Sequence, residues 1–330
     1  MKFEPTKLTK IIEQNYSFFA PFFYEMQTDY LHSMNILSKD LDSSLILMLL
    51  TKKIYPLALD KENEIINKLS VKNFYKENNY TLETSKFKIS EISGTLYLPR
   101  ETVRRKKLKL INDKLILFNK KNKTYSLNSE KIDEKAISRQ IEISNKLLYN
   151  YCVFFSQENS LFKEINFNSF KNEINNRFML YLPIFLNFQI YYFSNMRKFL
   201  DMECVFINLL CGLNTTNQLK KNNSESNKFY NLNDMFTQFT KIKKNFWLNS
   251  TSIADITKIP RTTVLRKLDK LEKLSLLKKD KFKRYATQDL ANTSLGKKEY
   301  LPQMQYTLKL LGIFISEYLE TYTSKDFKVS

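Results

Sequence analysis

Apolar residues recur every three or four positions along most of the chain, which is the spacing of amphipathic helices. Two long runs of this kind cover 6–37 and 170–200, and each has a proline near its centre, Pro21 or Pro183. A proline inside a helix removes one backbone hydrogen bond and clashes with the preceding turn, so we expect a kink at both. The aromatic residues of these runs recur at helical spacing and indicate core packing.

The pattern predicts four further helices. Shorter apolar helices follow the long runs, near 41–55 and 202–212, and long amphipathic helices are expected near 133–157 and 299–322. The polar tract Asn214–Asn231 predicts a loop.

Between these helices the pattern changes to a short helix, a tight turn, a longer helix and two short strands. In the second half of the chain these are expected at 252–257, 258–260, 261–274, 276–279 and 283–287. The first half predicts the same order. There the short helix starts at 89–92, the turn closes at 98–99, the longer helix covers 100–113, and the strands cover 115–119 and 124–127.

The chain is an internal duplication. Residues Pro99–Phe118 align without gaps on Pro260–Lys279, and nine of the twenty positions are identical. Upstream matches follow in the same order, including Pro21 with Pro183. The identical pairs of the strong block are Pro99/Pro260, Arg100/Arg261, Thr102/Thr263, Val103/Val264, Arg105/Arg266, Lys106/Lys267, Lys109/Lys270, Leu110/Leu271 and Leu115/Leu276.

Two copies are therefore predicted, 1–160 and 165–330, with the junction in the polar stretch Glu158–Phe170. About three residues are expected to be inserted in the first copy around Gly94–Tyr97, which would lengthen its turn. The fold class predicted is mainly α with small β-hairpins, as a pseudo-twofold tandem repeat with long flanking helices.

A helical wheel separates the two faces of the longer helices. The valine and leucine positions are expected to pack inward, whereas Lys107 lies on the same face and should sit at its margin with its amine outward. The opposite face carries Glu101, Thr102, Arg105 and Lys109 in copy one. The equivalent positions in copy two are Thr262, Thr263, Arg266 and Lys270.

That opposite face suits the major groove of DNA. Arginine can bind guanine through two hydrogen bonds, threonine can contact a base or a thymine methyl, and lysine contacts phosphate. The basic hairpins add cations that can contact phosphate. The residues predicted to contact DNA are Arg100, Glu101, Thr102, Arg104, Arg105, Lys106, Lys109, Lys120, Lys121 and Lys123 in copy one, and Arg261, Thr262, Thr263, Arg266, Lys267, Lys270, Lys279, Lys281, Lys283 and Arg284 in copy two.

The segment Ile253–Leu277, IADITKIPRTTVLRKLDKLEKLSLL, resembles the winged helix-turn-helix of bacterial transcriptional regulators, including the MarR-like and IclR-like groups. The resemblance implies winged units at about 86–128 and 250–288, with the longer helices in the major groove and the hairpins at the flanking minor groove. The terminal helices are similar to those through which MarR-like proteins dimerise, so one chain would form a pseudo-dimer. The family usually has glycine before the first wing strand, where this chain has Lys114 and Ser275.

Composition narrows the range of functions that the chain can have. The formal net charge of +19 favours polyanionic partners. A single histidine, His32, and isolated glycines exclude a Ser-His-Asp triad, a histidine-rich zinc site and a phosphate loop. Asp42 and Glu203 are interpreted as helix N-caps or first-turn charges rather than catalytic groups. We therefore expect no enzyme activity, no cofactor and no metal.

The sequence also predicts a location. The first ten residues lack a signal-peptide pattern, and the apolar stretch 177–193 is interrupted and shorter than a membrane span of about 20 residues. The three cysteines lie in apolar helical runs and are expected to be buried thiols. These features favour a cytoplasmic protein associated with a bacterial nucleoid and not with a membrane.

The function predicted is sequence-specific binding of double-stranded DNA by a transcriptional regulator, with two half-sites about 34–36 Å apart. A tandem winged-helix replication initiator is the first alternative, and a membrane-associated or protein-interaction scaffold is the second. The sequence leaves open a small-molecule effector, self-association beyond the pseudo-dimer, the target sequence and the sign of regulation.

Overall fold

The computed structural model describes residues 3–61, 83–131, 134–156, 167–176, 178–222, 229–239, 246–294 and 296–323. Helices make up 75% of it and are accompanied by two small antiparallel sheets, so the mainly helical class with small hairpins is confirmed. Most of the predicted junction 158–170 lies outside the described residues.

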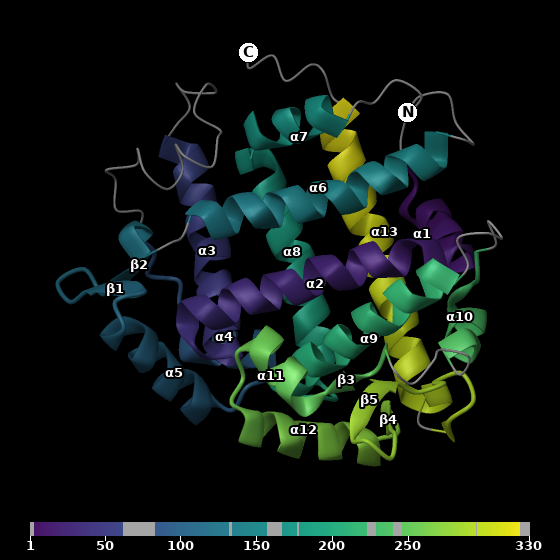
Figure 1. The fold of residues 1–330 in the computed structure, drawn as a ribbon. Helices are drawn as coiled ribbons and strands as arrows, with labels where there is room; N and C mark the ends of the chain where they lie inside the picture. The colour runs from purple at the N-terminus through teal and green to yellow at the C-terminus, as the bar shows by residue number, and fades with distance from the viewer. Residues whose placement is uncertain are drawn as a thin grey trace. The chain divides into compact units, whose positions relative to one another are not determined.

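The helices and strands follow one another in the order that the hydrophobic pattern predicts (Figure 1). The first copy contains α1 (Pro5–Gln14), α2 (Tyr16–Ser38), α3 (Leu41–Lys61), α4 (Ile89–Leu96), α5 (Arg100–Asn112), β1 (Ile116–Asn119), β2 (Thr124–Leu127), the 3₁₀ turn η3 (Ser129–Lys131) and α6 (Glu134–Ser156). The second contains α7 (Phe167–Asn176), α8 (Phe178–Arg197), α9 (Met202–Asn222), α10 (Leu232–Gln238), β3 (Leu248–Asn249), α11 (Ser250–Thr257), α12 (Arg261–Lys273), β4 (Leu277–Lys279), β5 (Arg284–Thr287), the π-helical turn η7 (Gly296–Tyr300) and α13 (Leu301–Thr323).

Five pairs of corresponding helices have equal lengths, whereas α2 has 23 residues and α8 has 20. The pairs α1/α7, α3/α9, α4/α11, α5/α12 and α6/α13 contain 10, 21, 8, 13 and 23 residues in each member. The hairpins differ in detail: β1 pairs with β2 in a two-stranded sheet, whereas β5 pairs with both β3 and β4. The duplication seen in the amino-acid sequence thus recurs in most elements, although α10 and β3 have no counterpart among the described elements of the first copy.

Three local predictions need correction. The first long run is two helices, because the chain breaks at Asn15, and Pro21 lies within α2 instead of at the break. In the second run α7 ends at Asn176 and α8 starts at Phe178, on either side of residue 177, which lies outside the described residues, and Pro183 lies inside α8. The polar tract predicted as a loop is helical as far as Asn222.

The end of α9 shows why the loop prediction was wrong. Thr215 and Thr216 donate their hydroxyls to the carbonyls of Cys211 and Gly212, at 2.7 and 2.9 Å, and Leu219 is buried. Each hydroxyl is therefore satisfied inside the helix, so a polar composition does not end it.

The predicted insertion lies before α4, not in the turn after it. The turns α4–α5 and α11–α12 have the same length, Tyr97-Leu98-Pro99 and Lys258-Ile259-Pro260. In the first copy four residues separate Thr84, which bridges to Tyr125, from α4, whereas β3 leads directly into α11.

The chain forms two compact units, and each contains parts of both copies. One unit consists of Met1–His32, Lys146–Lys163 and Phe199–Ser316, and the other of Ser33–Asn145, Glu164–Lys198 and Glu317–Ser330. In the first unit Nδ1 of His32 in α2 donates a hydrogen bond to the carbonyl of Ile256 in α11, with 2.8 Å between nitrogen and oxygen.

The second unit shows the reciprocal arrangement. Helix α8, from the second copy, packs on α3 and α4 from the first, and Lys198 lies 5.0 Å from the ring centroid of Tyr97. Tyr181 of α8 packs against Tyr318 of α13 with ring centroids 4.4 Å apart. The helix pair of each copy is thus completed by a long helix of the other copy.

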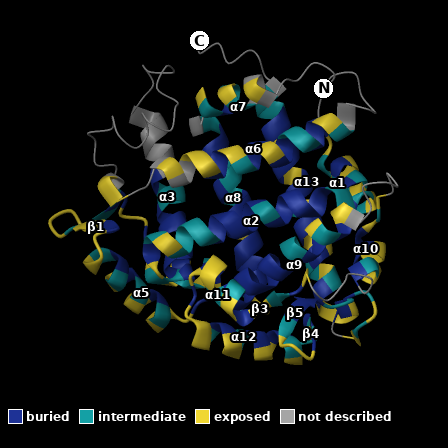
Figure 2. Ribbon diagram, viewed as in Figure 1, coloured by how far each residue is buried: buried dark blue, intermediate teal, exposed yellow. Residues whose placement is uncertain are grey.

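Buried residues lie along helices that belong to both units (Figure 2). In the first unit Phe19 stacks on Tyr151 with centroids 4.0 Å apart, and Tyr24 packs over Gly212, where a Cβ would lie 3.3 Å from its ring. The three cysteines are buried thiols, as predicted. No helix among the described residues combines the length and apolarity needed to cross a membrane.

Candidate functional site

The candidate site is the α4–α5 pair with its hairpin, and the equivalent α11–α12 pair. Each turn has one residue in the left-handed conformation, Tyr97 with φ 51° and Lys258 with φ 58°. A proline follows as the N-cap of the longer helix, Pro99 or Pro260, where its missing N–H costs no helical hydrogen bond. The shared turn geometry gives both longer helices the same start.

The inner faces of α5 and α12 are apolar, as predicted. Val103 and Leu110 in α5, and Val264, Leu268 and Leu271 in α12, have no exposed surface. Exposed positions recur along both helices in Figure 2. Burial of these valines and leucines therefore sets which side chains face solvent.

Lys107 corrects the prediction of an outward amine. Its side chain is buried, its Nζ donates to the carbonyl of Phe87 at 2.7 Å, and it lies 3.6 Å from the ring centroid of Tyr125. Burial lowers its pKa from 10.5 to about 8. The aromatic rings and the carbonyl of Phe87 compensate for the loss of water around the Lys107 amine. The amine therefore does not need to reach solvent.

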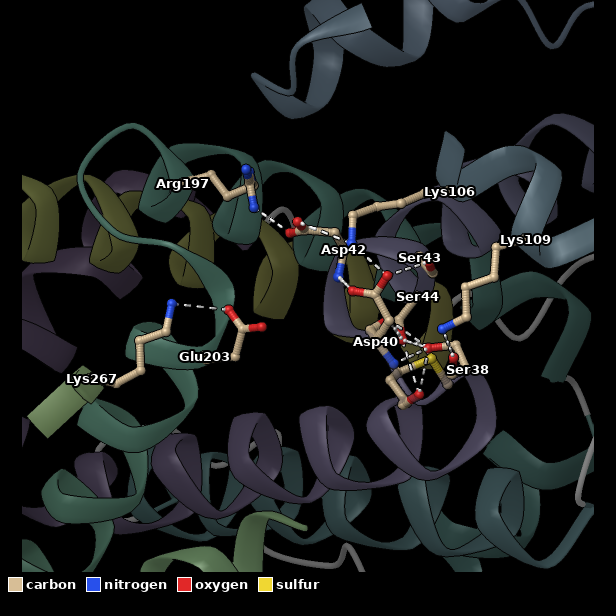
Figure 3. A network of polar contacts seen from close by, with 11 residues as sticks. Ser38, Asp40, Asp42, Ser43, Ser44, Lys106, Lys109, Arg197, Glu203 and Lys267 are labelled. Carbon is tan, nitrogen blue, oxygen red and sulfur yellow. Dashed lines mark hydrogen bonds and ion pairs between the residues drawn. The ribbon is translucent and has the colours of Figure 1, made fainter. Parts of the chain in front are cut away.

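Lys106, predicted to contact DNA, lies against the start of α3 instead. It forms ion pairs with Asp40 and Asp42, and Arg197 of α8 also pairs with Asp42 (Figure 3). Asp40 also accepts hydrogen bonds from the hydroxyl of Ser43 and the backbone N–H of Asp42. Burial alone would raise the pKa of Asp40, but the bonds from Lys106 and Ser43 outweigh it and lower that pKa.

Lys267 repeats this arrangement in the other unit. Its Nζ lies 2.7 Å from Asp201 and 3.6 Å from Glu203, in the first residues before and within α9. Burial would raise the pKa of Asp201, yet hydrogen bonds from Lys267 and Lys270 hold it well below its usual value. Only 12% of the Lys267 side chain is exposed, so its charge is used to attach α12 to α9.

The next matched lysines are also held by contacts within the fold, although 46% of the Lys270 side chain is exposed. Lys109 donates to the carbonyl of Ser38 at 3.2 Å, and Lys270 pairs with Asp201 at 2.9 Å. The carboxylates Asp40 and Asp201 were not among the predicted site residues. Their equivalent positions in the two copies, one residue before an apolar helix and opposite a matched lysine, were the available signal. Asp42 and Glu203 are first-turn charges of α3 and α9, as predicted.

The identical positions left facing solvent are two arginines and a threonine in each copy. Arg100, Arg105, Arg261 and Arg266 are exposed, and no hydrogen bond or ion pair of their side chains is found within the described part of the chain. Thr102 and Thr263 are half-buried beside them. The duplicated block thus contains a buried set, an ion-paired set and an Arg-Thr-Arg set in which the arginines are exposed and the threonine is half-buried.

The solvent faces differ where the sequences differ. In α5 Glu101 and Arg104 pair with each other at 2.7 Å, and the bond from Arg104 lowers the pKa of Glu101. In α12 the equivalent positions are Thr262 and Leu265, both exposed. The first helix therefore shows an internally neutralised pair where the second shows a hydroxyl and an apolar side chain.

The cations of the hairpins fall into a group held in ion pairs and a group for which the described residues provide no ion pair. Lys279 pairs with Glu272 at 2.7 Å, and Arg284 pairs with Asp280 at 2.7 Å. Lys278 is half-buried and donates to the carbonyl of Phe239, whereas five further hairpin lysines are exposed and no ion pair of theirs is found among the described residues. These are Lys120, Lys121 and Lys123 in the first hairpin and Lys281 and Lys283 in the second.

The ends of α5 and α12 have the left-handed geometry that glycine usually provides. Lys114 has φ 56° and Ser275 has φ 55°. The N–H of the next residue bonds back to Leu110 at 2.9 Å and to Leu271 at 3.0 Å. Both hairpins therefore start from the same helix end, although neither copy has glycine there.

No group of histidine, cysteine or acidic residues suited to a metal ion is found in the residues that the structure describes. Comparison with protein-family models, curated proteins and solved structures gave no significant match. The functional argument therefore rests on the geometry of the two helix pairs.

Proposed function

We propose that the chain binds double-stranded DNA sequence-specifically through α5 and α12, each with its hairpin forming a winged helix-turn-helix unit, and that it regulates transcription. The observation that carries this proposal is repeated at the start of both helices: two exposed arginines, with no ion pair found in the described part of the chain, flank a half-buried threonine.

The chemistry of this set fits the edges of base pairs. An arginine can donate two hydrogen bonds to guanine, and a threonine can contact a base through its hydroxyl or its methyl group. A side chain already held by a carboxylate is not available for this. Among the residues that the structure describes, no carboxylate forms an ion pair with Arg105 or Arg266, whereas Lys106 and Lys267 are ion-paired.

The hairpin lysines support phosphate contacts. Five exposed lysines without ion pairs lie on the two hairpins, and the net charge of +19 attracts a polyanion from a distance. The differences between Glu101-Arg104 and Thr262-Leu265 favour two unlike half-sites, one for each helix. An imperfect palindrome is the target that we expect.

The proposal is tested by selecting bound sequences from random duplex DNA and then measuring the affinity of variants. Arg105→Ala and Arg266→Ala should each weaken the selected site by about 1–3 kcal/mol and relax base preference in one half-site. Lys121→Ala and Lys281→Ala should weaken all sequences alike and lower the salt slope by about one.

Two variants serve as controls. Lys309→Ala removes an exposed charge on α13 and should leave the affinity unchanged. Lys267→Met should lower stability, because it leaves Asp201 with one cation fewer, which separates a folding effect from loss of a DNA contact. Equal losses on selected and random DNA for both arginine variants would contradict sequence reading by α5 and α12.

The site of binding in a genome separates regulation from replication initiation. Binding beside promoters supports a regulator, whereas binding to direct repeats at an AT-rich origin would favour the initiator. Binding to anionic vesicles without any binding to DNA would favour the scaffold.

A further inference from the structure

The tip of the second hairpin is a rigid turn with an aromatic side chain in solvent. Asp280 has a nearly fully buried side chain and accepts hydrogen bonds from the backbone N–H groups of Phe282 and Arg284, both at 2.9 Å. Its carboxylate also accepts from Arg284 Nε at 2.8 Å, and Lys283 takes a left-handed φ of 57°. The position of Phe282 is therefore set by the turn itself.

Phe282 is 65% exposed, the highest value given for a large hydrophobic residue in the described part of the chain. Cations surround it: Lys281 Nζ and the Arg284 guanidinium each lie 5.1 Å from its ring centroid, and Lys283 follows it in sequence. Tyr285, three residues further along the chain, is buried, whereas the phenyl ring of Phe282 lies in solvent.

The first hairpin has a related turn that is one residue longer and has no aromatic ring at its tip. Asn119 takes the place of Asp280 and accepts hydrogen bonds from the N–H groups of Lys121 and Asn122, at 3.0 and 3.3 Å. Lys123 has the left-handed φ of 54° that Lys283 has in the second hairpin. Only lysines and Asn122 occupy the tip, so the two hairpins offer a partner different chemistry.

We propose that Phe282 enters the minor groove of bound DNA and partly unstacks a base step, while the first hairpin contacts phosphates only. This inference rests on the proposed function of the two helix pairs. Charge complementarity favours DNA as the partner of this hairpin tip. The apolar ring of Phe282 is flanked by Lys281, Lys283 and Arg284, so the matching surface must offer anionic groups beside an apolar face. Apolar side chains inserted at base steps bend the duplex, at a cost offset by the added contact.

The experiment uses the full chain and its selected DNA site. Phe282→Ala should weaken binding by about 5- to 150-fold, the range of one lost aromatic–base contact, without changing the salt slope. Gel mobility of permuted fragments should show a smaller bend. Phe282→Leu should retain most of the bend, because leucine also serves as a wedge.

Matched variants separate this role from charge and from folding. Lys281→Ala should lower the salt slope by about one while the bend persists. Asn122→Ala in the first hairpin and Tyr306→Ala, an exposed aromatic of α13, should leave both affinity and bend unchanged.

Two results would overturn the inference. If Phe282→Ala binds and bends DNA as the parent does, while Arg105→Ala and Arg266→Ala weaken it, DNA binding stands and the aromatic contact does not. If Phe282→Ala loses binding to vesicles of anionic lipid and keeps DNA affinity, the ring serves a membrane surface. Absence of any DNA binding by the parent chain would overturn both proposals together.

Discussion

A lysine and a leucine occupy the same buried position in the two copies. Lys107 in α5 and Leu268 in α12 both point into their helix pairs, between a valine and a leucine that are identical in the two copies. The lysine is accommodated by the carbonyl of Phe87 and the ring of Tyr125, which leucine does not require. Burial of a cation carries a cost that depends on pH, since it disappears when the amine is neutral.

Stability should therefore depend on pH through Lys107. Its pKa in the folded chain is about 8, below the ordinary 10.5, so the unfolded state binds more protons between these values. The free energy of unfolding of the parent chain should rise with pH across this window, relative to Lys107→Met. The difference should reach up to about 3 kcal/mol.

Urea unfolding of the two proteins at pH 7 and pH 10.5 measures this difference and cancels the titration of tyrosines that both share. Parallel pH profiles for the parent and Lys107→Met would show that the amine is not the source.

Residue patterns predicted the direction of most side chains but not their partners. The periodicity of α5 and α12 identified the buried valines and leucines correctly, because burial follows from helical spacing. It assigned Lys106 and Lys267 to DNA, because helical spacing gives no information about Asp40 and Asp201 on another helix. Ion pairing depends on tertiary contacts, which no local pattern contains.

At the scale of elements, the ends of α5 and α12 offer a stability prediction. A side chain at positive φ is strained, and glycine relieves that strain. Lys114→Gly and Ser275→Gly should each raise the free energy of unfolding by about 0.5–1 kcal/mol, after the greater entropy of glycine in the unfolded chain is subtracted.

The urea midpoint measures the change, and Lys114→Ala and Ser275→Ala are the matched controls. Alanine keeps the strain, so neither control should gain stability. A glycine variant that unfolds no later than its alanine control would contradict the left-handed helix end.

Element predictions succeeded where the signal is periodic and failed where it is compositional. The bounds of α5 and α12 agree with the predicted 100–113 and 261–274 to within one residue. The break at Asn15 was missed, because the sequence predicted one helix over 6–37 with a kink at Pro21, and the polar end of α9 was mistaken for a loop. The winged units and the DNA-contacting residues stay predictions.

At the scale of the whole molecule, each compact unit depends on both copies. Fragments 1–160 and 165–330 contain one copy each, yet each unit combines segments from both fragments. Tyr192 and Phe193 of α8 are buried in the unit that contains α5, so the first fragment alone would lack part of its core.

We therefore expect neither fragment to fold cooperatively by itself. Coexpressed fragments should copurify and regain the helical circular dichroism and the single unfolding transition of the intact chain. The measurement is thermal unfolding of each fragment and of the reconstituted pair. A cooperative transition in fragment 1–160 alone, with full helical signal, would show that one copy is self-sufficient.

The covalent duplication removes a constraint that identical subunits impose. In a symmetric homodimer every substitution appears twice, so a change that suits one contact must also be tolerated at the other. Here Lys107 coexists with Leu268, and Asn122 with Phe282, in one polypeptide. Each half can acquire its own ligand preference by mutation. A complex with an asymmetric partner then has a defined polarity, because the chain binds the partner in one orientation and not in the reverse.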